Sequence, residues 1–173
     1  MKKIRVLFYK TPKKLKLKYI FNYLINLRTW SKYSHVELWT QDFKDLPFIH
    51  GTCWTSTMRD KDSGTVKRDA DSVLCHPENW DYKEITMFDR QYDSIMVYME
   101  KEVLHNEGYS KWDILKFLSP WHIDDTSRNI CSEFVNNALV AGRILYDSGI
   151  VSPGKVNSKL EDEHEEIEME SLV

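Results

Sequence analysis

The sequence predicts an α+β fold in which an antiparallel sheet packs against helices. Runs in the first half of the chain alternate apolar and polar residues, which is the period of a strand with one buried face. Two of these runs are separated by a short polar turn, as in a hairpin, and later runs place apolar residues at helical spacing. With 173 residues, 42% of them hydrophobic, we expect one domain over residues 1–160, followed by an acidic, mobile tail over residues 161–173.

Cysteine usage and hydropathy indicate the compartment. The three cysteines are an odd number without framework spacing, which argues for a reducing environment and against a disulfide scaffold. No apolar run approaches the roughly 20 residues of a membrane span. The basic start at Met1 is followed by an apolar run that is too short and interrupted for a signal peptide. We therefore expect a cytoplasmic protein.

The first half is predicted to supply three strands and one helix. In order, the expected elements are a strand at Lys3–Tyr9, a helix at about Lys13–Leu27 that begins with Thr11 and Pro12, a strand at Lys32–Thr40, a turn at Gln41–Asp45 and a strand at Pro47–Trp54. Residues 2–32 contain many Lys and Arg and no Asp or Glu. A basic amphipathic helix can lie weakly on an anionic membrane or on nucleic acid. We favour a helix packed on the core with a solvated lysine face, and we expect no nucleic-acid partner because the basic residues are not interleaved with aromatic ones.

The rest of the chain is predicted to supply two strands, a helical turn and three helices. The expected elements are a loop at Thr55–Ser63, a short strand at Thr65–Lys67, a helical turn at Asp69–Cys75, a strand at Asp81–Phe88, a helix from Asp93 that ends at Gly108, a short helix at Lys111–Leu118, a helix after Asn129 and a turn at Val151–Gly154.

A cysteine in the first turn of a late helix is the main candidate for chemistry. Thr126, Ser127 and Asn129 are possible N-caps before Cys131, apolar residues follow at helical spacing, and Gly142 is a stop signal. Unpaired N–H groups and a partial positive charge at a helix N-terminus favour a thiolate over a thiol. A lone cysteine would more often be a small buried residue, so the interpretation depends on a partner.

His35 is the candidate partner. In its strand, His35, Glu37 and Trp39 are predicted to share one face. Hairpin pairing is expected to bring His50 beside His35. A nucleophile, a base and a group that orients the base are what covalent catalysis by a thiol needs.

Other combinations of residues have less support as a functional site. A zinc site from Cys53, Cys75, His76 and the other candidates lacks the paired spacing of zinc ligands, so we expect no metal and no cofactor. An acidic pair of Glu37 with Asp124 or Asp125 is supported only by the abundance of carboxylates. Trp39, Trp54 and Trp121 are candidates for a substrate groove, together with Glu37, although tryptophans are more often core residues.

Three motifs carry a resemblance to a known family. Tyr33-Ser34-His35-Val36-Glu37-Leu38, then Phe48-Ile49-His50, then Asn129-Ile130-Cys131-Ser132-Glu133-Phe134-Val135 resemble the circularly permuted papain-like proteins, which include NlpC-like hydrolases and the lecithin–retinol acyltransferase group. The segment Gly108–Leu115 resembles the family's linker before the cysteine, and Val151–Pro153 resembles the segment that usually ends the domain. The likeness therefore spans Ile4 to Pro153. Segments at Thr55–Met58, His76-Pro77 and Trp80–Tyr82 are similar to small proteins of tailed bacteriophages.

The resemblance implies a permuted papain-like fold and a thiol protease-like site. By position, Cys131 matches the nucleophile, His35 the general base and His50 the third polar position, with Glu37 as a substitute. The expected function is a cysteine hydrolase or acyltransferase acting on an amide, peptide, thioester or ester through an acyl-enzyme. The alternative is a non-catalytic binding or inhibitory phage protein that engages a host protein, in the host cytoplasm or packaged in a virion. The fold alone does not choose among these.

Overall fold

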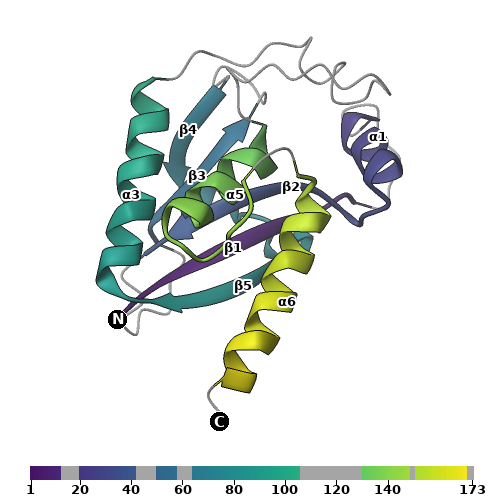
Figure 1. Cartoon of the computed structure of the whole chain (residues 1–173). Helices are drawn as coiled ribbons and strands as arrows, with labels where there is room; N and C mark the ends of the chain where they lie inside the picture. The colour runs from purple at the N-terminus through teal and green to yellow at the C-terminus, as the bar shows by residue number, and fades with distance from the viewer. Residues whose placement is uncertain (13–19, 42–49, 58–63, 106–129, 149–150, 171–173) are drawn as a thin grey trace.

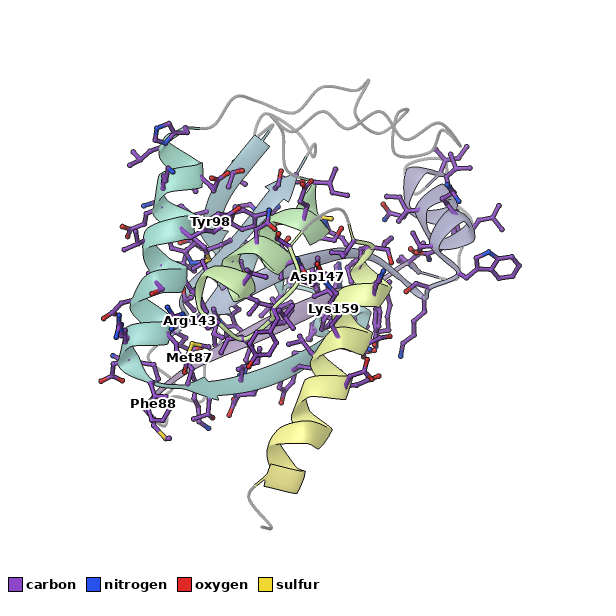
Figure 2. All side chains as sticks on the ribbon, viewed as in Figure 1. Met87, Phe88, Tyr98, Arg143, Asp147 and Lys159 are labelled. Atoms are coloured by element: carbon purple, nitrogen blue, oxygen red, sulfur yellow. The ribbon has the colours of Figure 1, made fainter. Side chains whose placement is uncertain are left out.

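The molecule is built on a five-stranded antiparallel sheet with strand order β4-β3-β2-β1-β5 (Figure 1). The computed structural model describes residues 1–12, 20–41, 50–57, 64–105, 130–148 and 151–170. The strands are β1 (Lys2–Lys10), β2 (Tyr33–Thr40), β3 (Thr52–Thr57), β4 (Gly64–Asp69) and β5 (Trp80–Met87). The helices are α1 (Ile20–Thr29), α2 (Ala70–Val73), the 3₁₀ turn η2 (Pro77–Asn79), α3 (Asp89–Leu104), α5 (Cys131–Ala141) and α6 (Pro153–Glu170). The predicted α+β class, with an antiparallel sheet and helices, is confirmed.

The main core lies between one face of the sheet and three helices, α3, α5 and α6 (Figure 1). Alternate residues of the central strands point to these helices, among them Val6, Phe8, Val36 and Leu38. The alternation that the sequence displays therefore selects the helix-facing side chains directly.

The opposite face of the sheet carries a second, smaller cluster. Leu7, Trp39 and Cys53 pack there with Ala70 and Leu74, at the two ends of α2. Because both faces are covered, every residue of β2 is buried. The strand that carries His35 is thus the most enclosed strand of the sheet.

The end of α5 is fixed by close packing. The helix stops at Gly142, as predicted, but Gly142 keeps a right-handed conformation and Arg143 takes the left-handed one, with φ of 55°. A Cβ atom on Gly142 would lie 2.6 Å from Cγ1 of Ile95 on α3. Glycine is needed here so that α3 and α5 can approach each other.

The C-terminal helix begins where a turn was predicted. The Ser152 hydroxyl accepts a hydrogen bond from the Lys155 N–H at 3.2 Å, so Ser152 is the N-cap and Pro153 the first helical residue. Val156 and Leu160 bury against the core. The helix then continues to Glu170, through much of the segment expected to be a mobile tail, and the domain boundary at residue 160 stays a prediction.

Four further predictions differ from the structure or lie outside it. The predicted loop from Thr55 is wrong, because β3 runs on to Thr57. The apolar side of α1 was expected to pack on the core, yet Ile20, Leu24 and Leu27 are exposed. The predicted helix at 111–118 and the first part of the predicted helix at 13–27 lie outside the described residues.

Candidate active site

The candidate site lies where β2 and β3 separate. The two strands pair over Leu38–Thr40 and Thr52–Trp54, whereas Thr55 to Thr57 pair with β4 alone. Val36 pairs with Phe8 of β1, but its backbone has no strand partner on the β3 side. The Thr55 hydroxyl donates to the Val36 carbonyl at 3.1 Å, and the Val36 N–H donates to the sulfur of Cys131. A threonine and a cysteine thus satisfy the backbone groups that a neighbouring strand would otherwise satisfy.

Cys131 is the first residue of α5. Ile130 is the N-cap, in an extended conformation and without a side-chain cap, and its carbonyl accepts the Phe134 N–H at 2.9 Å. The predicted caps at 126, 127 and 129 lie outside the described residues. The N–H of Ser132 donates to the Cys131 sulfur as well. Two backbone donors and the helix N-terminus therefore surround the thiol, which remains partly exposed.

His35 reaches this sulfur from β2. The imidazole of His35 and the thiol of Cys131 are hydrogen-bonded. On its other side, Nε2 of His35 lies 3.0 Å from Oε1 of Glu37 and 3.3 Å from the Thr55 hydroxyl. Because a carboxylate can only accept, Glu37 favours the proton on Nε2 and leaves Nδ1 as the nitrogen that faces the sulfur. This is the arrangement of nucleophile, base and orienting group that thiol catalysis uses.

The pKa shifts of Cys131 and His35 favour the charged forms of both side chains. Burial alone would raise the pKa of Cys131, but the charge and hydrogen bond of His35 and the two backbone N–H groups bring this pKa below its ordinary value. Burial alone would lower the pKa of His35, but Cys131 and Glu37 raise it above its ordinary value. Both shifts favour a thiolate facing an imidazolium.

Glu37 is itself held by a cation. Its carboxylate is completely buried and its Oε1 also accepts a hydrogen bond from Nη2 of Arg68 on β4. A buried carboxylate is costly unless it is paired and hydrogen-bonded. The neighbouring Cys53 has the opposite character to Cys131, because burial and the charge of Glu37 raise its pKa. Of these two thiols, only Cys131 has a pKa that is shifted toward the thiolate.

His50 does not lie beside His35. The hairpin pairs Thr40 with Thr52, so His50 precedes β3 at the end of the hairpin opposite His35. It is exposed, and its carbonyl accepts a hydrogen bond from Nε1 of Trp39 at 2.9 Å. The expected adjacency is wrong because β3 begins later than the sequence pattern predicted.

The described tryptophans of the predicted groove are core residues. Trp54 packs among the helix-facing side chains and donates to the Thr40 hydroxyl at 2.8 Å. Trp39 belongs to the second cluster and lies beneath the guanidinium of Arg5 at 5.0 Å. Trp121 lies outside the described residues, as do Asp124 and Asp125. Neither described ring lines an open surface.

Three residues of the site were not predicted from the sequence. Trp80 presents an edge-on ring to His35, with centroids 6.4 Å apart, and Arg68 and Thr55 make the contacts described above. Trp80 immediately precedes a predicted strand, so its position in β5 was missed by one residue. Arg68 had no local signal, because its approach to Glu37 depends on two strand registers.

Comparisons with known proteins assign no family. No family model matches the sequence, and no curated protein matches it. Within the described ranges, no group of three or more His, Cys, Asp or Glu residues is arranged to hold a metal ion. Among the helices that the structure describes, none has the length and hydrophobicity to cross a membrane.

Proposed function

We propose that the chain is a cysteine-dependent hydrolase or acyltransferase in which Cys131 is the nucleophile, His35 the general base and Glu37 the group that orients His35. One observation carries this proposal. The thiol at the start of α5 is hydrogen-bonded to an imidazole whose Nε2 lies 3.0 Å from a buried carboxylate. Glu37 takes the third position in place of His50.

The chemistry follows from these positions. The Cys131 thiolate attacks a carbonyl carbon, a C–S bond forms, and the carbonyl electron pair moves onto oxygen. The N–H of Cys131, in the first turn of α5, has no intrahelical acceptor and is a candidate donor to that oxygen. As the tetrahedral species collapses, the bond to the leaving amine, alcohol or thiol breaks, and the imidazolium of His35 gives that group its proton. Water or an amine then loses a proton to His35 and attacks the thioester, which releases the acyl group and regenerates the thiol.

The order of the elements supports a permuted papain-like scaffold. The strand with the histidine precedes the helix with the cysteine, as in the NlpC-like and lecithin–retinol acyltransferase groups that the sequence resembles. The proposed substrates are therefore amides or peptides, thioesters or esters. The three free cysteines support a reducing compartment, which for a phage protein is the host cytoplasm.

An acyl-transfer assay tests the proposal. The full chain is mixed with p-nitrophenyl acetate, nitrophenolate release is followed, and the acetylated residue is mapped by mass spectrometry. We expect a rapid burst and acetylation of Cys131, both lost in Cys131→Ala and retained in Cys75→Ala, which removes an exposed thiol.

Two results would contradict the proposal. Equal acetylation of Cys75 and Cys131 would mean that the site confers no special reactivity. A folded wild-type protein without a burst, with Cys131 alkylating as an ordinary thiol, would favour a binding protein on the same scaffold.

A further inference from the structure

Helix α1 carries three of its apolar side chains on its outer side. Ile20, Leu24 and Leu27 are spaced four and three residues apart and so share one side of the helix. Their exposed fractions are 47%, 39% and 72%. A helix of a globular protein normally turns such a stripe toward the core. In α1 the stripe faces away from the core instead.

Polar groups hold α1 on the body of the protein. The Asn26 amide donates to the Thr11 hydroxyl at 2.9 Å, and the Tyr23 hydroxyl donates to the carbonyl of Pro12. The Thr11 hydroxyl continues the chain of hydrogen bonds to Ser34 on β2 at 2.9 Å. These contacts fix the orientation of α1 and leave its leucines outside.

Trp30 follows the apolar stripe directly after the end of α1. Its side chain is 92% exposed and its backbone is left-handed, with φ of 51°. The N–H of Ser31 bonds to the Asn26 carbonyl at 3.3 Å, which closes the helix around this residue. Glycine or asparagine is the usual residue at such a position. Neither burial nor backbone preference accounts for a tryptophan here, whereas the interface between water and lipid is where exposed tryptophans are enriched.

The sequence around α1 is basic. Residues 2–32 contain many Lys and Arg and no Asp or Glu, although the whole chain has a net charge of −3. Among the described residues, Lys10 and Lys32 are ion-paired with Asp81, whereas Arg28, in the last turn of α1, is exposed beside the stripe. An apolar stripe with a cation beside it and a tryptophan after it matches the chemistry of an anionic lipid surface.

We propose that the α1 surface, formed by Ile20, Leu24, Leu27, Arg28 and Trp30, docks on an anionic lipid membrane. The apolar side chains enter the interface while Arg28 faces lipid phosphates, and the helix lies along the membrane plane. The docking does not depend on the reaction proposed for Cys131. It requires only the exposed side of α1.

Vesicle sedimentation tests the proposal on the full chain. We expect binding at low salt to vesicles of equal parts phosphatidylcholine and phosphatidylglycerol, and weaker binding to pure phosphatidylcholine or at high salt. Leu24→Asp with Leu27→Asp should weaken binding at least about tenfold. Val97→Asp with Leu104→Asp is the matched control, because these α3 side chains are 67% and 84% exposed and should not affect binding.

A second variant separates docking from folding. Trp30→Gly relieves the left-handed backbone, so it should raise the urea midpoint while lowering vesicle binding. Failure of the wild-type protein to sediment with the anionic vesicles would overturn the proposal, as would unchanged binding by the Leu24→Asp, Leu27→Asp variant. A wild-type dimer that this variant abolishes, without vesicle binding, would assign the surface to a second copy of the chain instead.

Discussion

Oε1 of Glu37 lies 3.0 Å from Nε2 of His35, two residues earlier on the same strand. Residues two apart on a strand point to the same face, so this contact follows from the local backbone. The proposed base and the group that would orient it are therefore parts of one strand. The proposed nucleophile comes from a different element, α5, so the geometry of the site depends on how α5 is held against β2.

The thiol of Cys131 should ionise below the range of an ordinary thiol. Its pKa is lowered and that of His35 is raised, and both shifts favour a thiolate–imidazolium pair. The rate of alkylation by iodoacetamide should rise through a pKa below about 8.5, the value of a free thiol. Mass spectrometry of the Cys131 and Cys75 peptides follows both thiols in one sample. A Cys131 profile centred at or above about 8.5 would contradict the expectation.

Replacing Glu37 should lower the pKa of His35. Glu37→Gln removes a charge that raises the pKa of His35, so this pKa should fall. The thiolate then loses part of its imidazolium partner, and the alkylation profile of Cys131 should move to higher pH. NMR titration of the His35 ring measures the first shift, and iodoacetamide measures the second. Unchanged values for both groups would show that Glu37 does not orient the site.

The same substitution should destabilise the fold through Arg68. Glu37→Gln leaves this guanidinium without its carboxylate partner, which should cost about 2 kcal/mol or more in the free energy of unfolding. Adding Arg68→Met should recover part of that loss, because the unpaired guanidinium is then removed. Urea denaturation of the two single variants and the double variant measures the coupling. Strictly additive losses would mean that the two side chains do not interact.

Gly142→Ala should destabilise the contact between α3 and α5. The new Cβ would lie 2.6 and 2.7 Å from Cγ1 and Cδ1 of Ile95. The backbone of Gly142 is right-handed, so alanine brings no backbone strain, and the expected loss of about 1–3 kcal/mol comes from overpacking. In an Ile95→Ala background the same substitution should cost less. An equal cost in both backgrounds, measured with urea, would rule out this cause.

The ionised carboxylate of Asp81 should stabilise the fold, and this contribution should be lost in acid. Partial burial would raise its pKa, but hydrogen bonds from Lys10, Tyr33 and Lys32 bring it down to about 2. A depressed carboxyl pKa stabilises the fold above the unfolded value of about 3.9, and this contribution disappears as the pH falls through about 2. Asp81→Asn should therefore flatten the stability curve between about pH 4 and 2. Identical curves for both proteins would contradict this assignment.

The sequence predicted the elements whose signals are local. Alternation along β2 correctly placed His35 and Glu37 on one face, and helical spacing after Cys131 correctly predicted α5. Both signals come from neighbouring residues, so no knowledge of the rest of the chain was needed.

The remaining site contacts depend on long-range pairing. Thr55, Ser56 and Thr57 looked like a loop because they are polar, yet they are buried in β3. Arg68 reaches Glu37 through two registers, Trp39 with Cys53 and Cys53 with Arg68. A one-residue shift in either register would turn these side chains to different faces. The same dependence explains why His50 was wrongly placed beside His35.

The separation of β2 from β3 makes one backbone amide a probe of the position of Cys131. The amide hydrogen of Val36 points at the sulfur and not at a strand carbonyl. Its rate of exchange with deuterated solvent therefore measures how often α5 withdraws from the strand. Chemical modification of the thiol should change that rate at Val36, while amides shared by β1 and β5 keep theirs.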